Sequence, residues 1–562
     1  MPLSTVPTIR RAGTKRSRTG CRTCRARRVK CDETPVACRN CTSTGRQCDG
    51  YDPHRLPIRW RRGSKKNNAV TYLQPARDPG KTVAWAMTSD ERQCFAYFHG
   101  HTVPTLLQFF DSDLWQKLVP QLTRNEPPVY HAVVGLSAIH WSCEKSGMRL
   151  ATPASILVED ALNHFAQEQL GRSIASLNRR CASQDPYIRH VILVCCLLFV
   201  IADLLRGRYE EGLSHLRSGI SIIKELQGYN VSSQSLIEQP LISAFAHLDI
   251  LASHYNNTFP MFSPDNLPGS TQPISSVIPH TGAHFRSLPE VRIAFDNLLR
   301  CIYRFCSRYF GAPESEIALY YESLQAEQIQ ILSWMLHFKQ YFEPFYVNFY
   351  PSLTAKEQLG LDIIKLHLLS SPIGLKSMLL GNNKAPLAYY TSDLATVCSL
   401  AEQIMSKIPE RPSVTIDNGI LPPLFHACTL CCDYTIRWWA FELLQSWPHR
   451  EGPFDSNWMA YLCGEMLKLD LEVLCDADPG FRDRLFVLRD GKELSVHKML
   501  TEITFSQQKQ LDGLGGRRFV QHIPDHPASA FLNNFAELKG MRGWSCVRAY
   551  TAATSRKANC SV

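Results

Sequence analysis

Six cysteines near the N-terminus have the residue type and spacing to hold metal. They are Cys21, Cys24, Cys31, Cys38, Cys41 and Cys48. Each half of this array begins with a C-x-x-C pair and ends with a third cysteine after six intervening residues, so the second half repeats the first. A two-residue gap lets one turn present two thiolates to one tetrahedral ion. Because every ligand is a thiolate, the array is typical of a closed structural zinc site and not of a catalytic one. Six thiolates can complete two four-coordinate sites if two sulfurs bridge both ions.

The stretch that carries these cysteines is too poor in apolar residues to fold by itself. Val29 and Val36 are its only sizeable aliphatic residues, and so small a segment cannot build a hydrophobic core. Structural zinc contributes on the order of 10–16 kcal/mol near neutral pH, which can replace that core. A disulfide framework is the alternative. The opening Met-Pro-Leu-Ser-Thr and the basic tract after it lack an apolar signal segment, so we expect the metal.

Positive charge is concentrated in the same region. Residues 1–66 hold 18 Lys and Arg against 4 Asp and Glu, whereas the remainder holds 43 against 47. This imbalance predicts that residues 1–66, and not the rest of the chain, bind a polyanion. Arg27, Arg28 and Lys30 lie between the second and third cysteines, where we expect a short helix. Their side chains suit the paired O6 and N7 acceptors that guanine offers in the major groove of DNA.

The six cysteines, the basic run from Arg25 to Lys30 and Pro35 together resemble the fungal binuclear zinc-cluster transcription regulators. The resemblance implies two Zn(II) ions bridged by Cys21 and Cys38. One site is then completed by Cys24 and Cys31, and the other by Cys41 and Cys48. It also implies that the end of the short helix reads a CGG-type triplet upstream of RNA polymerase II genes, in the nucleus. The DNA-contact candidates are Arg25, Arg27, Arg28, Lys30 and Arg39, with Arg22 and Arg46 as further phosphate contacts.

Composition divides the chain into five parts. We expect a basic disordered tail at 1–20, the zinc cluster at 21–50, a basic linker at 51–88, a helical body at 89–505 and an irregular tail at 506–562. Residues 49–98 contain no sustained heptad repeat, so dimerisation through a coiled coil is unsupported. The predicted fold class is a small metal-stabilised module joined to a large all-α domain.

Apolar periodicity indicates that the body is helical. Gly207 separates an apolar run at 191–205 from an amphipathic stretch at 209–226, which predicts a helical hairpin. The longest uninterrupted apolar run, 191–202, is shorter than a membrane span, so a buried core helix is the better interpretation. Apolar residues between Ile317 and Phe338 recur as in a coiled coil. However, Leu319, Tyr320, Leu332 and Leu336 widen the apolar face, which favours a core helix over a dimer seam.

The body carries a second resemblance. The stretches Phe109–Trp115 and Glu126–Ala132 look like the opening of the fungal-specific transcription-factor domain. The stretches Asp417–Phe425 and Pro448–Gly452 resemble its closing region, with Asp433 and Arg437 between them. These motifs occur in the expected order and bracket more than 300 residues.

Two functions are consistent with these observations. The first is a nuclear regulator that binds double-stranded DNA and whose body receives co-regulators or a small-molecule effector. The second is a zinc-containing interaction protein or enzyme tethered to RNA or to a complex. No aromatic residue lies between Cys21 and Cys48; zinc modules that bind single strands usually stack bases on aromatic rings, so duplex DNA is favoured. The absence of a phosphate loop, a G-x-S-x-G elbow and an H-E-x-x-H motif argues against an enzyme. The Cys428-x-x-Cys431 pair lacks further ligands and is interpreted as buried thiols.

Overall fold

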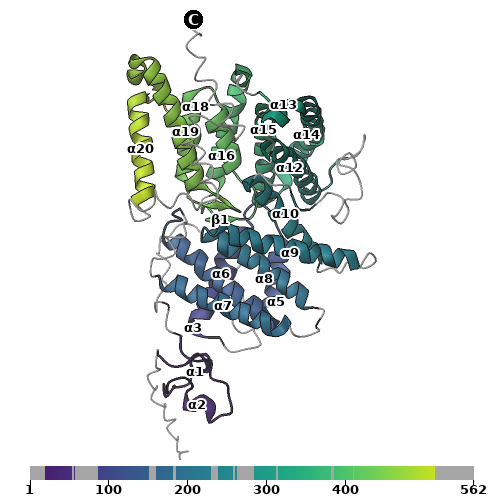
Figure 1. Ribbon diagram of the computed structural model, residues 1–562, viewed down its shortest axis with the longest axis vertical. Helices are drawn as coiled ribbons and strands as arrows, with labels where there is room; N and C mark the ends of the chain where they lie inside the picture. Colours follow the sequence, from purple (N-terminus) through teal and green to yellow (C-terminus); the bar gives the residue numbers. More distant parts are fainter. Residues whose placement is uncertain are drawn as a thin grey trace, which may run out of the picture.

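The computed structural model describes residues 19–52, 56, 87–150, 160–181, 185, 187–229, 238–256, 260–262, 284–311, 314–380, 385–408 and 410–512. A small module lies at one end of the molecule, below a large helical body (Figure 1). This arrangement confirms the predicted class of a cysteine-rich module joined to an all-α domain. Residues 1–18 of the tail expected at 1–20, residues 513–562 of the tail expected at 506–562, and most of the linker lie outside the described residues.

The helices and strands follow one another in this order. The module contains α1 (Arg22–Arg27) and α2 (Arg39–Thr42). The first half of the body contains α3 (Ser89–Tyr97), α4 (Val103–Leu106), α5 (Val119–Asn125), α6 (Pro127–Lys145), α7 (Ala161–Cys181), α8 (Ile188–Leu205), α9 (Tyr209–Tyr229) and α10 (Glu238–Asn256). The second half contains α12 (Leu288–Gly311), α13 (Glu314–Leu319), α14 (Tyr321–Phe349), α15 (Ala355–Met378), α16 (Thr391–Lys407), α17 (Leu421–Leu430), α18 (Tyr434–Ser446), α19 (Ser456–Ala477) and α20 (Val496–Asp512). The short strands are β1 (Val414–Thr415), β2 (Arg450–Glu451), β3 (Phe454–Asp455), β4 (Leu485–Val487) and β5 (Glu493–Ser495).

The helical body is expected to begin at residue 89 and to end at residue 505. Helix α3 begins at Ser89, where Thr88 and Glu91 form a capping box that satisfies the first backbone amides. Helix α3 is the first helix of the described part of the body, and the boundary at residue 89 stays a prediction. At the other end, α20 continues to Asp512. The expectation of irregular structure from residue 506 onwards is therefore wrong for 506–512, because the helix continues through them.

The helical hairpin predicted on either side of Gly207 is present as α8 and α9. Gly207 has a φ of +71°, a left-handed conformation that glycine adopts at little cost. By length and composition α8 could cross a membrane, but 83% of it is buried inside the body, so it is a core helix. On α9, the apolar stripe expected from the sequence faces the core; its buried members are Leu213, Leu216, Ile220 and Ile223.

Helix α14 confirms one part of its prediction and corrects another. Its inner stripe, which includes Leu324, Ile331 and Phe338, is buried as expected of a core helix. Of the residues that widen this apolar face, Leu332 is partly buried against the core, whereas the other three do not join it. Leu319, Tyr320 and Leu336 are 74%, 51% and 60% exposed. Because α14 lies at the periphery of the body (Figure 1), only one stripe meets neighbouring helices.

A small sheet lies between the two halves of the body (Figure 1). β1 pairs in parallel with β2, and β2 pairs antiparallel with β3. On β2, the fully buried carboxylate of Glu451 accepts hydrogen bonds from the backbone N–H groups of Gly419, Ile420 and Leu421 at the start of α17. A helix N-terminus leaves such amides without partners and favours a negative charge. Glu451 thereby joins the two stretches of the closing region.

Asp417, also in the closing region, anchors it to α10 and α12 through buried charges. Its carboxylate lies 2.6 Å from Arg292 of α12 and 3.2 Å from His247 of α10. His247 also lies 3.5 Å from Asp296. Burial by itself lowers the pKa of His247, but the nearby carboxylates outweigh burial and raise it to about 9. The imidazolium is therefore the form that the folded body stabilises.

The raised pKa of His247 predicts a pH-dependent stability. A histidine whose folded pKa lies above its ordinary value stabilises the fold fully below pH 6.5, and this contribution disappears as the pH rises to 9. We expect urea unfolding of the protein to show a loss of about 1–3 kcal/mol between pH 6.5 and 9.5. His247→Gln should be less stable at pH 6.5 and should lose much less over this range. The exposed His497 provides the matched control, His497→Gln. A His247→Gln curve parallel to that of the wild type would contradict this assignment.

Candidate metal centre and nucleic-acid interface

The six cysteines of the array come together as two overlapping groups of four. One group is Cys21, Cys24, Cys31 and Cys38, and the other is Cys21, Cys38, Cys41 and Cys48. The ligand atoms within each group lie within 4.8 Å of one another. Cys21 and Cys38 belong to both groups, and their sulfurs are 3.5 Å apart. The geometry therefore places these two thiols between two four-sulfur sites.

The separations between the sulfurs suit zinc. Cys24 Sγ lies 3.6 Å from Cys38 Sγ, and Cys21 Sγ lies 3.8 Å from Cys41 Sγ. A disulfide requires about 2.0 Å, so these are not disulfide bonds. Tetrahedral zinc with Zn–S bonds of about 2.3 Å places its sulfurs about 3.8 Å apart. The donor set and its spacing therefore fit a zinc-thiolate cluster.

The backbone of the module repeats itself around these sulfurs. Cys21 begins α1 and its sulfur accepts the N–H of Cys24, just as Cys38 begins α2 and accepts the N–H of Cys41. The repeat extends to the third cysteine of each half, because the sulfurs of Cys31 and Cys48 accept the N–H groups of Cys21 and Cys38. These N–H···S bonds orient the sulfurs inward and favour their ionised form.

Sulfur takes the place of a hydrophobic core in the module. The buried residues of α1, α2 and the loops between Cys21 and Cys48 are cysteines. Val29 and Val36 are 40% and 90% exposed, so the two aliphatic residues do not contribute a core. Burial raises the pKa of the Cys21 and Cys38 thiols. Buried thiolates need a compensating positive charge, which a bound cation supplies.

The predicted DNA-contact residues fall into two groups. Arg28, Lys30 and Arg39 are exposed on the module. Arg28 ends α1 in the left-handed conformation, with φ 60° and ψ 33°. This conformation is uncommon outside glycine and turns the chain sharply after the helix. Arg27 is half-buried, so the exposed basic side chains at the end of α1 are those of Arg28 and Lys30.

Arg25 does not face solvent in the same way. Its guanidinium pairs with Asp52, and the side chain is 9% exposed. Asp52 is also 2.5 Å from Arg172 on α7. Arg22, a predicted phosphate contact, pairs with the buried Glu91 of α3. Spacing within the cysteine array could not reveal these partners, because Glu91 and Arg172 are brought close only by the fold of the body.

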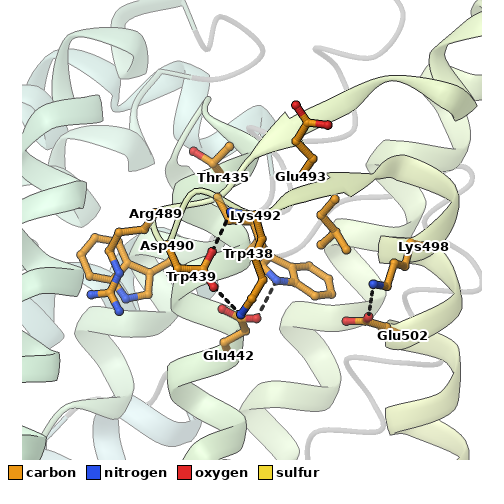
Figure 2. A pocket seen from close by; sticks show the side chains of 12 residues that line it. Thr435, Trp438, Trp439, Glu442, Arg489, Asp490, Lys492, Glu493, Lys498 and Glu502 are labelled. Carbon is orange, nitrogen blue, oxygen red and sulfur yellow. Dashed lines mark hydrogen bonds and ion pairs between the residues drawn. The ribbon is translucent and has the colours of Figure 1, made fainter.

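The body has no second gathering of potential metal ligands in the part of the chain that the structure describes. Cys428 and Cys431 are buried, as expected of core thiols, whereas Cys432 is exposed. A pocket of about 280 Å³ lies between α18, α20 and the β4–β5 hairpin (Figure 2). Its charges pair with one another: Lys492 lies 2.5 Å from Asp490 and Lys498 lies 4.0 Å from Glu502. The pocket therefore does not present one sign of charge to a ligand.

Comparison with known proteins identifies both domains. Residues 19–56 match the fungal Zn(2)-Cys(6) binuclear cluster domain, and residues 93–315 match the fungal specific transcription factor domain. The second match includes the opening motifs at 109–132, and the closing motifs at 417–452 lie beyond it. The name of the second domain denotes a transcription factor, and the relatives described next are named transcription regulators and not enzymes.

Several curated relatives are similar over part of the chain. The aspercryptin biosynthesis cluster-specific transcription regulator of Emericella nidulans is 29% identical over 45% of this chain and 42% of its own length. The transcription regulator lscL of Purpureocillium lilacinum is 26% identical over 39% of this chain and 54% of its own. A Zn(2)-C6 fungal-type transcription factor of Aspergillus fumigatus is 32% identical over 23% of this chain and 33% of its own. The chain thus matches about half the length of the first two relatives. No solved structure matches significantly.

The left-handed conformation of Arg28 yields a prediction about metal retention. Arg28→Ala and Arg28→Gly both remove the guanidinium, but only glycine relieves a backbone cost of about 1–2 kcal/mol. Because folding of the module and metal binding are linked, Arg28→Gly should resist a chelator about 5- to 10-fold better than Arg28→Ala. Chelator titration followed by metal release measures this ratio. Equal resistance of the two variants would show that the conformation stores no cost.

Proposed function

This chain carries the two domains of the fungal zinc-cluster transcription regulators, and from this premise we propose that it regulates transcription by RNA polymerase II. It acts in the nucleus, binds double-stranded DNA through its cysteine-rich module and reads a CGG-type triplet. The observation that carries the proposal is the six-thiol cluster with Arg28 and Lys30 exposed at the end of α1. The helical body receives co-regulators or a small-molecule effector.

The metal cofactor of this function is a pair of zinc ions. Cys21 and Cys38 bridge them, Cys24 and Cys31 complete the first site, and Cys41 and Cys48 complete the second. Support comes from the overlap of the two four-sulfur groups at the two proposed bridging residues. The zinc has a structural role, because all its ligands are protein thiolates and no position remains for a substrate. It fixes α1 relative to the rest of the module.

Duplex DNA is the partner that the module suits best. Arginine offers paired donors to guanine O6 and N7, and the exposed Arg28 extends from the end of α1. Tyr51, an aromatic residue beside the cluster, packs against the cysteines and donates its hydroxyl to the Thr34 carbonyl at 2.7 Å. A ring held in this way is a poor stacking platform for single-stranded bases. This arrangement disfavours the RNA-tethered alternative.

The bridging assignment predicts unequal effects of cysteine substitutions. The protein should contain two zinc ions per chain by metal analysis. Cys38→Ser should lose both, because it removes a ligand from each site, whereas Cys24→Ser should lose mainly one. Cys432→Ser, at an exposed thiol outside the cluster, is the control and should keep both. One zinc per chain in a folded wild-type module would contradict the shared-thiolate arrangement.

The division between base and phosphate contacts predicts a difference in specificity. Arg28→Ala should cost about 1–3 kcal/mol on a CGG-containing duplex and much less on a scrambled one. Arg46, exposed on the opposite half of the repeat, is a phosphate candidate. Arg46→Ala should weaken both duplexes alike and reduce the salt slope by about one. Salt-titrated binding measures both effects. If Arg28→Ala weakens the two duplexes equally, Arg28 contacts phosphate and does not read bases.

A further inference from the structure

Two arginines of α1 are engaged by the helical body and by the chain that follows the cluster. Arg22 enters the body beside Glu91, whose side chain is 1% exposed. The same carboxylate accepts a hydrogen bond from Gln169 of α7 at 3.3 Å. Charge near this site also affects His131, whose pKa is lowered to about 4 by burial and by the proximity of Arg22. Arg22 is thus held in a built polar site of the body.

Asp52 forms a second connection between the cluster and the body. Its carboxylate is 2% exposed and lies between Arg25 of α1 and Arg172 of α7. Burial by itself raises the pKa of Asp52, but the two arginines outweigh it and lower the pKa below its usual value. The carboxylate is therefore ionised at neutral pH and links two guanidinium groups.

The short segment after Cys48 keeps this carboxylate in position. The backbone N–H of Arg22 donates to the Gly50 carbonyl at 2.8 Å. Thr23 Oγ1 donates to Asp49 at 2.8 Å, so the segment lies along α1. Further on, Leu56 is 1% exposed and belongs to the apolar core of the body. Asp52 and Leu56, which lie in the segment expected to be a linker, thus contact the neighbouring domains.

We infer that α3 and α7 of the body form a docking surface for the zinc cluster and restrain its binding to DNA. In the docked state, carboxylates hold the guanidinium groups of Arg22 and Arg25, which are then not available to phosphates. DNA competes with Glu91 and Asp52 for the same two cations. Docking therefore lowers the apparent affinity by the fraction of molecules in which the cluster is undocked. The inference rests on the proposed DNA binding, but the docking itself does not.

Substitution of Arg172 provides a test, because docking and simple electrostatics predict opposite changes in the affinity for DNA. Arg172→Glu places a second carboxylate opposite Asp52 and should release the cluster. Removing positive charge ordinarily weakens DNA binding, yet release of Arg22 from Glu91 of the body should strengthen it about 3- to 10-fold on CGG-containing and scrambled duplexes. The control is Arg179→Glu, the same charge change at an exposed position on α7. It should bind slightly more weakly than the wild type.

Docking is measured separately, without DNA, by modifying arginines with phenylglyoxal in the full chain and locating the products by mass spectrometry. In the wild type, Arg22 and Arg25 should react more slowly than the exposed Arg39. In Arg172→Glu, the reactivity of Arg22, whose partner Glu91 belongs to the body, should rise toward that of Arg39, and in Arg179→Glu it should not. If Arg172→Glu does not fold, Arg172→Gln and its control Arg179→Gln replace the pair.

The outcomes of these experiments test the docking, the restraint on DNA binding and the proposed function separately. Equal reactivity of Arg22, Arg25 and Arg39 in the wild type overturns the docking. Protected arginines combined with weaker DNA binding by Arg172→Glu, as in Arg179→Glu, overturn the restraint. Protected arginines in a zinc-loaded protein that binds neither duplex, in any variant, overturn the proposed function while the docking stands.

Discussion

The packing of six thiols into a space with no apolar core is the constraint on which the structure of the cysteine-rich module depends. Burial disfavours the thiolate form of Cys21 and Cys38, and their sulfurs lie 3.5 Å apart. Like charges at that distance repel strongly unless a cation lies between them. A cluster of this kind folds around its metal, and the orientation of α1 follows from it. The sulfurs of Cys21 and Cys24 thus fix the backbone of α1, from which the arginines extend.

The helical body also contains buried charges, and each is compensated by polar partners. Glu451 satisfies the backbone amides at the start of α17, and Asp417 is held by Arg292 and His247. Each of these carboxylates is buried, so each would be costly without its partners. Together they connect the closing region to α10, α12 and α17. The two halves of the body are thereby joined by polar contacts as well as by apolar packing.

The cysteine-rich module and the helical body meet at ion pairs between arginines of the module and carboxylates. Arg22 and Arg25 carry the charge proposed to contact phosphates, and in this structure they pair with Glu91 and Asp52. A buried carboxylate and a DNA phosphate offer arginine the same kind of acceptor. A basic residue in a DNA-binding module can thus belong to an internal interface in one state and to the DNA complex in another.

The sequence by itself determined what depends on neighbours along the chain. The cysteine spacing predicted a metal site of six thiols, because each C-x-x-C pair is presented by one local turn, and the family resemblance implied which two sulfurs are shared. Apolar periodicity predicted the α8–α9 hairpin, because one face of a helix repeats every three or four residues. Only the tertiary structure decided which side chains meet over long separations: Glu91 lies 69 residues from Arg22, and Arg172 lies 120 from Asp52. Likewise, the apolar pattern of α14 could not show that Leu336 faces solvent, because exposure depends on which neighbouring helices reach that face.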